Sequence, residues 1–149
     1  MSKPVKPVIP MPLADEDERP VSLNPEGWLK PVGYANGMSA KGRIVVTGGV
    51  VGWDLMGKFP EDFAGQALQC FSNIKAIIEA GGASVSHIVR LTWYVTDVEE
   101  YLANLKPLGK AYRAIFGQHY PAMAVVQVVR LVEKAAKIEI EATAVVAEQ

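Results

Sequence analysis

The spacing of apolar residues changes from a helical period to a strand period in mid-chain, and this change restricts the fold more than any other feature. Over Phe63–Ala80, apolar side chains recur every three or four residues, which predicts a helix that Gly81 and Gly82 would end. Over residues 87–96 they alternate, which predicts a strand. A chain with both periods belongs to a mixed α and β class.

Weaker patterns complete the order β-β-α-β-α-β-β. Asp97 is the expected N-cap of a second helix, where Glu100 would complete a capping box and Pro107 would break the first turn. We expect an α+β two-layer fold, in which two helices lie on one face of a mixed β-sheet. The other strands are expected within residues 21–29, 43–49, 122–131 and 137–146.

Apolar residues on both faces of the predicted strands indicate that the helix-free face must also be covered. The candidates for this second apolar face are Ile88, Tyr94, Val126 and Val128. We expect a homotrimer that closes its sheets around a barrel-like centre.

The first 20 residues differ from the rest. They hold five of the 10 prolines and an acidic run at residues 15–18, which are incompatible with a helix or a central strand. We therefore expect an extended N-terminal arm over residues 1–20 and a single domain over residues 21–149. The arm is either mobile or packed on a neighbouring subunit.

The charge balance disfavours several classes of partner. The formal net charge of the 149-residue chain is -1, which gives no field to hold a nucleic acid. We find neither an apolar run long enough to span a membrane nor a secretory signal. These features favour a soluble cytoplasmic domain that binds neither nucleic acid nor membrane.

A search for catalytic and metal-binding motifs is mostly negative. His87, His119 and Cys70 have no metal-ligand spacing, so we expect no metal site. Cys70 lies within the predicted helix and is either a small core residue, which we favour, or a nucleophile. Glu139 and Glu141 share one face of the last strand, either as solvated carboxylates or with one of them as a general base.

Several segments together resemble the RidA family, also called YjgF, and the resemblance spans residues 34–146. It implies a chorismate-mutase-like fold, a homotrimer with clefts between subunits, and no cofactor or metal. It also implies hydrolysis of reactive enamines and imines, small metabolites that pyridoxal-phosphate enzymes form, to keto acids and ammonia. The segments that carry the resemblance are Val46-Thr47-Gly48-Gly49, residues 67–83, 87–97, Tyr120-Pro121-Ala122, residues 128–131 and 137–142.

The resemblance also assigns site residues. It makes Glu139 the catalytic residue. If this carboxylate points into the cleft between subunits, we expect it near Met123 and Val125 on the neighbouring strand. Met123 stands where the family's deaminases have the arginine that holds the substrate carboxylate, and a thioether cannot make that charge-assisted contact. The expected substrate-binding residues are Tyr34, Gly48, Gly49, Trp53, Met123 and Val125.

Two functional hypotheses follow from these departures. The first is a divergent enamine or imine deaminase whose substrate is altered by Met123, and Glu139 and Tyr34 favour it. The second is a non-catalytic trimeric protein that binds a small ligand in the same cleft. It is favoured by Met123 and by Gly48, which stands where the family often has serine; Val125 and Gly109 likewise replace a family cysteine and asparagine.

Overall fold

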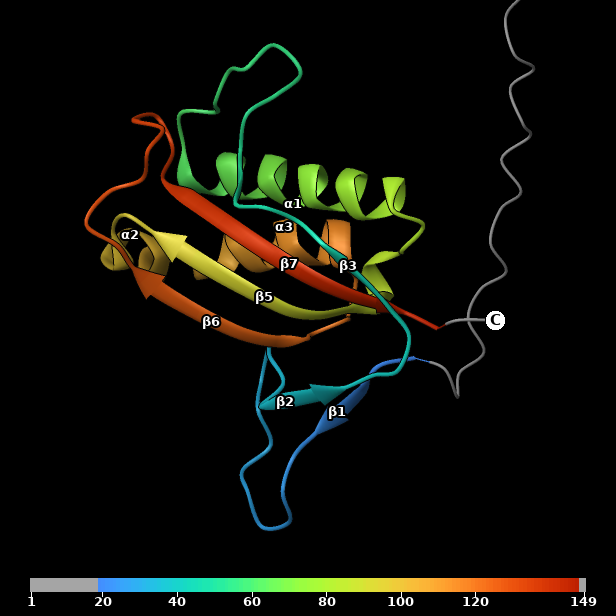
Figure 1. Cartoon of the computed structure of the whole chain (residues 1–149). Coiled ribbons are helices and arrows are strands. Elements are labelled where there is room, and N and C mark those ends of the chain that lie inside the picture. The colour runs from blue at the N-terminus through green and yellow to red at the C-terminus, as the bar shows by residue number, and fades with distance from the viewer. Residues whose placement is uncertain (1–18, 148–149) are drawn as a thin grey trace, which may run out of the picture.

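A computed structural model describes residues 19–147 of the chain (Figure 1). The acidic run at residues 15–18 and all but the last two residues of the expected arm fall outside the described part. In chain order the elements are β1 (Val21–Leu23), β2 (Gly37–Ser39), β3 (Arg43–Val46), β4 (Val50–Val51), α1 (Phe63–Ala80), the 3₁₀ turn η2 (Val85–His87), β5 (Ile88–Val95), α2 (Val98–Ala103), α3 (Leu105–Phe116), β6 (Ala122–Gln127) and β7 (Ile138–Val146).

The main sheet has the strand order β3-β7-β5-β6, and the short β4 also pairs with β7. β5 and β6 are parallel, and the other pairs in this sheet are antiparallel. α1 and α3 lie on one face of the sheet, while β1 and β2 form a separate ribbon below it (Figure 1). The expected α+β fold, with a mixed sheet and helices on one face, is therefore confirmed.

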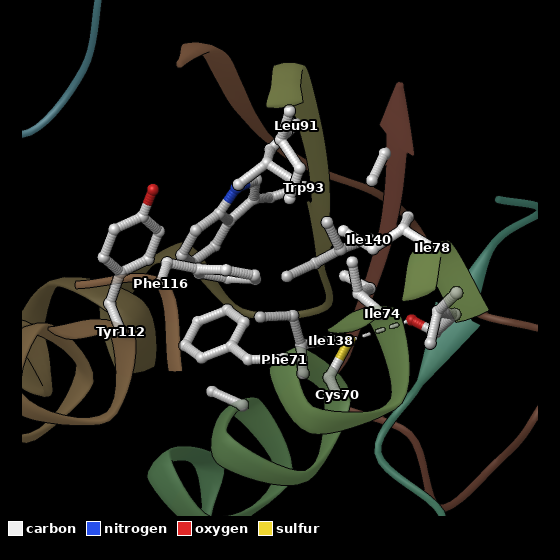
Figure 2. Close-up of a cluster of buried hydrophobic side chains, with 14 of the residues drawn as sticks. Cys70, Phe71, Ile74, Ile78, Leu91, Trp93, Tyr112, Phe116, Ile138 and Ile140 are labelled. Carbon is white, nitrogen blue, oxygen red and sulfur yellow. Dashed lines mark hydrogen bonds between the residues drawn. The ribbon is translucent and has the colours of Figure 1, made fainter. Parts of the chain in front are cut away.

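The core lies between these helices and the sheet (Figure 2). The helical pattern predicted for α1 is confirmed, because its apolar positions are buried, and Phe71 packs edge-on against the rings of Trp93 and Tyr112. Cys70 is also buried, and its Sγ lies 3.1 Å from the Val50 carbonyl oxygen, to which it donates a hydrogen bond. Burial raises the pKa of the Cys70 thiol, so Cys70 is a core residue rather than a nucleophile.

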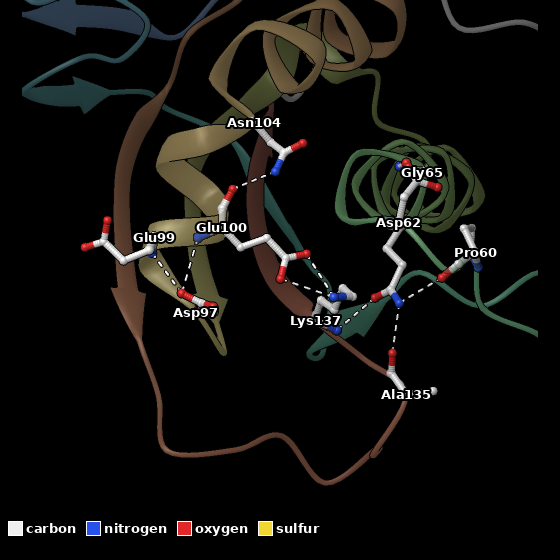
Figure 3. A network of polar contacts seen from close by, with 10 residues as sticks. Pro60, Asp62, Gly65, Asp97, Glu99, Glu100, Asn104, Ala135 and Lys137 are labelled. Carbon is white, nitrogen blue, oxygen red and sulfur yellow. Dashed lines mark hydrogen bonds and ion pairs between the residues drawn. The ribbon is translucent and has the colours of Figure 1, made fainter.

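The second predicted helix is in fact two helices. Asp97 caps α2 as expected, but the break between α2 and α3 falls at Asn104. Pro107 is the third residue of α3, where a missing N–H costs no hydrogen bond. Glu100 does not complete a capping box; its carboxylate binds Lys137 Nζ at 2.9 Å (Figure 3).

The prediction for Ile88 is wrong. A register irregularity between Ile88 and Arg90 turns Ile88 toward the helices, where only 1% of it is exposed. Tyr94 and Val128 instead pack partly against a small second cluster of Val51, Leu131 and Ala136. β6 is also shorter than expected, because it ends at Gln127.

The helix-free face of the sheet retains exposed apolar side chains. Ile44 is 66% exposed, Val46 61% and Val126 43%. We call this surface the open face; its register pairs place Glu139, Glu141 and Tyr94 on it as well. Between residues 19 and 147, no helix is both long and apolar enough to cross a membrane.

Candidate functional site

The expected site residues separate into two groups within one chain. Glu139 and Gly49 lie together on the open face, whereas Tyr34, Met123 and Val125 line a cavity on the helix side of the sheet. We call these two sets of residues the Glu139 group and the cavity group. The sheet lies between them, so neither group alone forms a complete site.

The arrangement of the Glu139 group depends on an interruption between strands β3 and β4. The two strands pair with different parts of β7, and Thr47 anchors the short stretch that joins them. Its N–H donates to the Ala142 carbonyl at 2.9 Å, and its Oγ1 accepts from the Ala142 N–H at 3.0 Å. Gly48 and Gly49 follow this anchor and are exposed.

Gly49 is in direct contact with the Glu139 carboxylate. A Cβ on Gly49 would lie 2.8 Å from Cδ of Glu139 and 3.0 and 3.1 Å from its two oxygens. Only a residue without a side chain allows this approach. A Cβ on Gly48 would meet nothing within 4 Å, so the neighbouring position in the chain is not restricted in this way.

Tyr94 joins the same surface, although the sequence did not suggest it as a site residue. It pairs with Glu139 across β5 and β7, and its hydroxyl donates to Glu141 Oε1 at 2.7 Å. This hydrogen bond raises the pKa of the Tyr94 phenol. Glu141 is therefore an exposed carboxylate with a hydrogen-bond partner, while Glu139 is half-buried beside Gly49. The alternation of β5 could have revealed Tyr94.

The cavity group surrounds a volume of about 510 Å³ between α3 and β6. Tyr34 reaches it because the next residue, Ala35, is fixed beside β6: its N–H donates to the Pro121 carbonyl at 3.0 Å, and it bridges to Ala122. The walls are mainly aromatic and apolar. The lining residues include Tyr34, Trp93, Tyr101, Tyr112, Tyr120, Met123 and Val125.

Within one chain, Glu139 does not lie near Met123 and Val125, so their expected proximity stays a prediction for the cleft between subunits. β5 separates β7 from β6, so the two strands are not neighbours. Met123 and Val125 pair with Leu91 and Trp93, which face the helices, whereas Glu139 points to the open face. Strand order depends on contacts between distant segments, which the local pattern of each strand does not specify.

Trp53 belongs to neither group. It lies in the connection between β4 and α1, is 46% exposed, and packs against Phe59 with ring centroids 6.3 Å apart. It does not line the cavity.

Two further residues of the cavity were missed by the sequence analysis. Trp93 is buried, and its indole Nε1 has no hydrogen-bond partner among the described residues. Arg113, one turn after Gly109 on α3, also lines the cavity. Its guanidinium lies against Gly109, where a Cβ would meet Arg113 Nη1 at 3.1 Å. The four-residue spacing on one helix was the only indication in the sequence.

The histidines have backbone partners. His87 Nδ1 accepts from the Ser84 N–H at 2.9 Å, and His119 Nε2 lies 2.7 Å from the Ile88 carbonyl oxygen, to which it donates. Burial lowers the pKa of both imidazoles. Within residues 19–147, His, Cys, Asp and Glu side chains form no cluster that could hold a metal ion.

Comparisons with known proteins agree with this architecture. Residues 29–146 match the family described as Endoribonuclease L-PSP. The 2-iminobutanoate/2-iminopropanoate deaminase of Escherichia coli K12 is 37% identical over 115 residues, which cover 75% of this chain and 86% of that protein. The corresponding protein of Salmonella typhimurium LT2 is 39% identical over 116 residues, with the same coverage.

Solved structures of the same group match closely. YyfB of Yersinia pestis, a member of the Rid family, superposes with a TM-score of 0.76 at 28% identity, covering 86% of this chain and 99% of that one. E. coli TdcF with bound serine superposes with a TM-score of 0.61 at 32% identity, covering 88% and 95%. The chain therefore belongs to the Endoribonuclease L-PSP family, the group that contains the RidA, YjgF and other Rid proteins.

Proposed function

We propose that this protein is a homotrimeric deaminase that hydrolyses a reactive enamine or imine of a small metabolite. In this proposal, the Glu139 group of one subunit faces the cavity group of the next, so that the active site lies between subunits. The observation that carries most weight is the contact of the Glu139 carboxylate with Gly49 on the open face. Membership of a family that includes 2-iminobutanoate/2-iminopropanoate deaminases supports the reaction class.

The separation of the two groups supports a site between subunits. The Glu139 group has a base but lies on an exposed surface, and the cavity group surrounds a half-open volume but has no carboxylate in its lining. The open face also exposes Ile44, Val46 and Val126, and burial of these side chains against another subunit is favourable. A cyclic assembly would cover this face and complete the site in one step.

Hydrolysis needs a positioned water and a base. Glu139 accepts a proton from water as the water oxygen bonds to the imine carbon, and it then passes this proton to the imine nitrogen, which gives a carbinolamine. Glu139 next takes the hydroxyl proton of the carbinolamine and passes it to the amino nitrogen, so that the C–N bond breaks, ammonia leaves and a carbonyl group is formed. The sum is imine plus water to carbonyl plus ammonia, and it requires neither a metal nor an organic cofactor.

A second candidate is a non-catalytic protein that binds a small ligand in the same cleft. Met123 favours it, because a thioether cannot hold a carboxylate as the family's arginine does. Cleavage of RNA is not proposed, because a net charge of -1 does not attract a polyanion.

A coupled assay separates the two candidates. An amino-acid oxidase generates 2-imino acids from a series of amino acids, and the protein competes with semicarbazide for the imine. Wild-type protein should reduce semicarbazone formation, and Glu139→Gln should abolish this effect. Binding of the product keto acid without any effect of wild-type protein on the imine would favour the non-catalytic candidate.

A further inference from the structure

The cavity contains a cation that differs in position from the family's arginine. We propose that Arg113 holds the carboxylate of the substrate, in place of the arginine absent at Met123, and that the substrate carries a large apolar or aromatic side chain. This inference rests on the proposed function. It assigns the specificity of the site to α3, whereas the family's arginine lies on the strand that is β6 here.

Arg113 occupies space that Gly109 leaves empty. Glycine inside a helix destabilises it relative to alanine, so its presence in the middle of α3 calls for a local reason. The guanidinium Nη1 would lie 3.1 Å from a Cβ at position 109, and Cζ would lie 3.8 Å away. A Cβ at position 109 would therefore be in tight contact with the guanidinium, which would have to shift by a few tenths of an ångström.

The charges around the cavity favour an anionic ligand. Arg113 is the one charged residue among the described residues that line it. Its guanidinium makes no ion pair with a described carboxylate, so its donors are available. Arg90 and Arg130 do not line the cavity: Arg90 is on the open face, and Arg130 is in the connection between β6 and β7.

The remaining walls indicate the rest of the ligand. Trp93 and Tyr112 are stacked with ring centroids 6.4 Å apart, and Tyr112 and Tyr120 are stacked at 5.4 Å. An apolar side chain would bury its surface against these rings, which favours binding. The unpartnered Nε1 of Trp93 is a further donor that a polar group of the ligand could satisfy if the cavity adjusts.

Binding of phenylpyruvate, a stable 2-keto acid with an aromatic side chain, tests the inference without requiring turnover. Calorimetry on the full chain compares wild type, Arg113→Gln and the matched control Lys110→Gln, an exposed cation on the same helix that does not line the cavity. Arg113→Gln should weaken binding about 10- to 100-fold through loss of a charge-assisted contact, and Lys110→Gln should leave it unchanged. The neutral ketone phenylacetone has no carboxylate, so it should bind wild type and Arg113→Gln equally.

A rescue variant distinguishes charge from structure. Adding Met123→Arg to Arg113→Gln returns a guanidinium to the cavity and should restore phenylpyruvate binding. The indole N–H resonance of Trp93 should shift when phenylpyruvate binds, which locates it in this cavity. Equal binding by wild type and Arg113→Gln, or no binding by wild type, would overturn the inference. Arg113-dependent binding without imine hydrolysis would instead overturn the proposed function and leave Arg113 as the anion-holding residue.

Discussion

At the scale of single residues, the proposed chemistry depends on the contact between Gly49 and Glu139. The carboxylate is half-buried on the open face and lies against a backbone without a side chain. This contact limits the positions that the carboxylate can take, which favours a productive geometry with water. Glu141, two residues further along β7, is held by the Tyr94 hydroxyl and is more exposed.

Glu139→Gln should reduce imine hydrolysis about 100- to 10,000-fold, because it removes the proposed general base and keeps the shape of the side chain. Binding of the product keto acid should survive. Steady-state rates of wild type and variant in the semicarbazide assay provide the measurement. Glu141→Gln is the matched control: it retains an oxygen that can accept from Tyr94, and its rate should stay near that of wild type. Equal losses at the two positions would contradict a special role for Glu139.

Gly49→Ala should displace the Glu139 carboxylate, because the added Cβ would lie 2.8 Å from Cδ. We expect a lower rate and a loss of about 1 kcal/mol or less in the free energy of unfolding, because the carboxylate is the end of a flexible side chain and can move away from an exposed site. Urea unfolding at matched protein concentration and the rate assay measure both effects. Gly48→Ala adds the same methyl group where nothing lies within 4 Å and should change stability little. If Gly49→Ala were equally harmless, the contact would not matter.

At the scale of elements, Gln66 links α1 to two loops and to the start of β7. Its Nε2 donates to the carbonyls of Pro60 at 2.9 Å and Ala135 at 2.8 Å, and its Oε1 accepts from the Lys137 N–H at 2.8 Å. The residue is almost fully buried. Its side chain therefore satisfies three backbone groups at once.

Gln66→Leu should lower the free energy of unfolding by about 2–4 kcal/mol, because it leaves these backbone groups without a partner. Urea unfolding of both proteins measures the difference. Gln69→Leu, on the same helix, removes one hydrogen bond to Asn73 within α1 and should cost less than about 1 kcal/mol. Comparable losses in the two variants would show that the three-way link contributes little.

The elements that were predicted correctly are those whose residues carry a complete local pattern. α1 has an N-cap, a continuous apolar stripe and a terminating glycine pair, and all of these lie within residues 62–82. The break at Asn104 and the irregularity at Ile88 were missed because packing against distant segments decides them. For the same reason the sequence identified Glu139 and Tyr34 as candidates but could not assign them to opposite sides of the sheet.

At the scale of the whole molecule, one chain has two incomplete half-sites and an exposed apolar surface. The open face that carries the Glu139 group also exposes Ile44, Val46 and Val126. The proposed trimer would bury this face and bring the cavity of one subunit to Glu139 of another. The family resemblance suggested clefts between subunits, and the strand order gives a physical reason why one chain would need a neighbour.

Mixing two inactive variants tests this arrangement most directly. Glu139→Gln removes the base, and Met123→Trp fills the cavity; each homotrimer should be inactive in the imine assay. When the variants are co-expressed and purified together, random assembly should give about a quarter of the sites both an intact Glu139 and an intact cavity, and about a quarter of the wild-type activity should return. No recovery in trimers shown by mass spectrometry to contain both variants would contradict a site built between subunits.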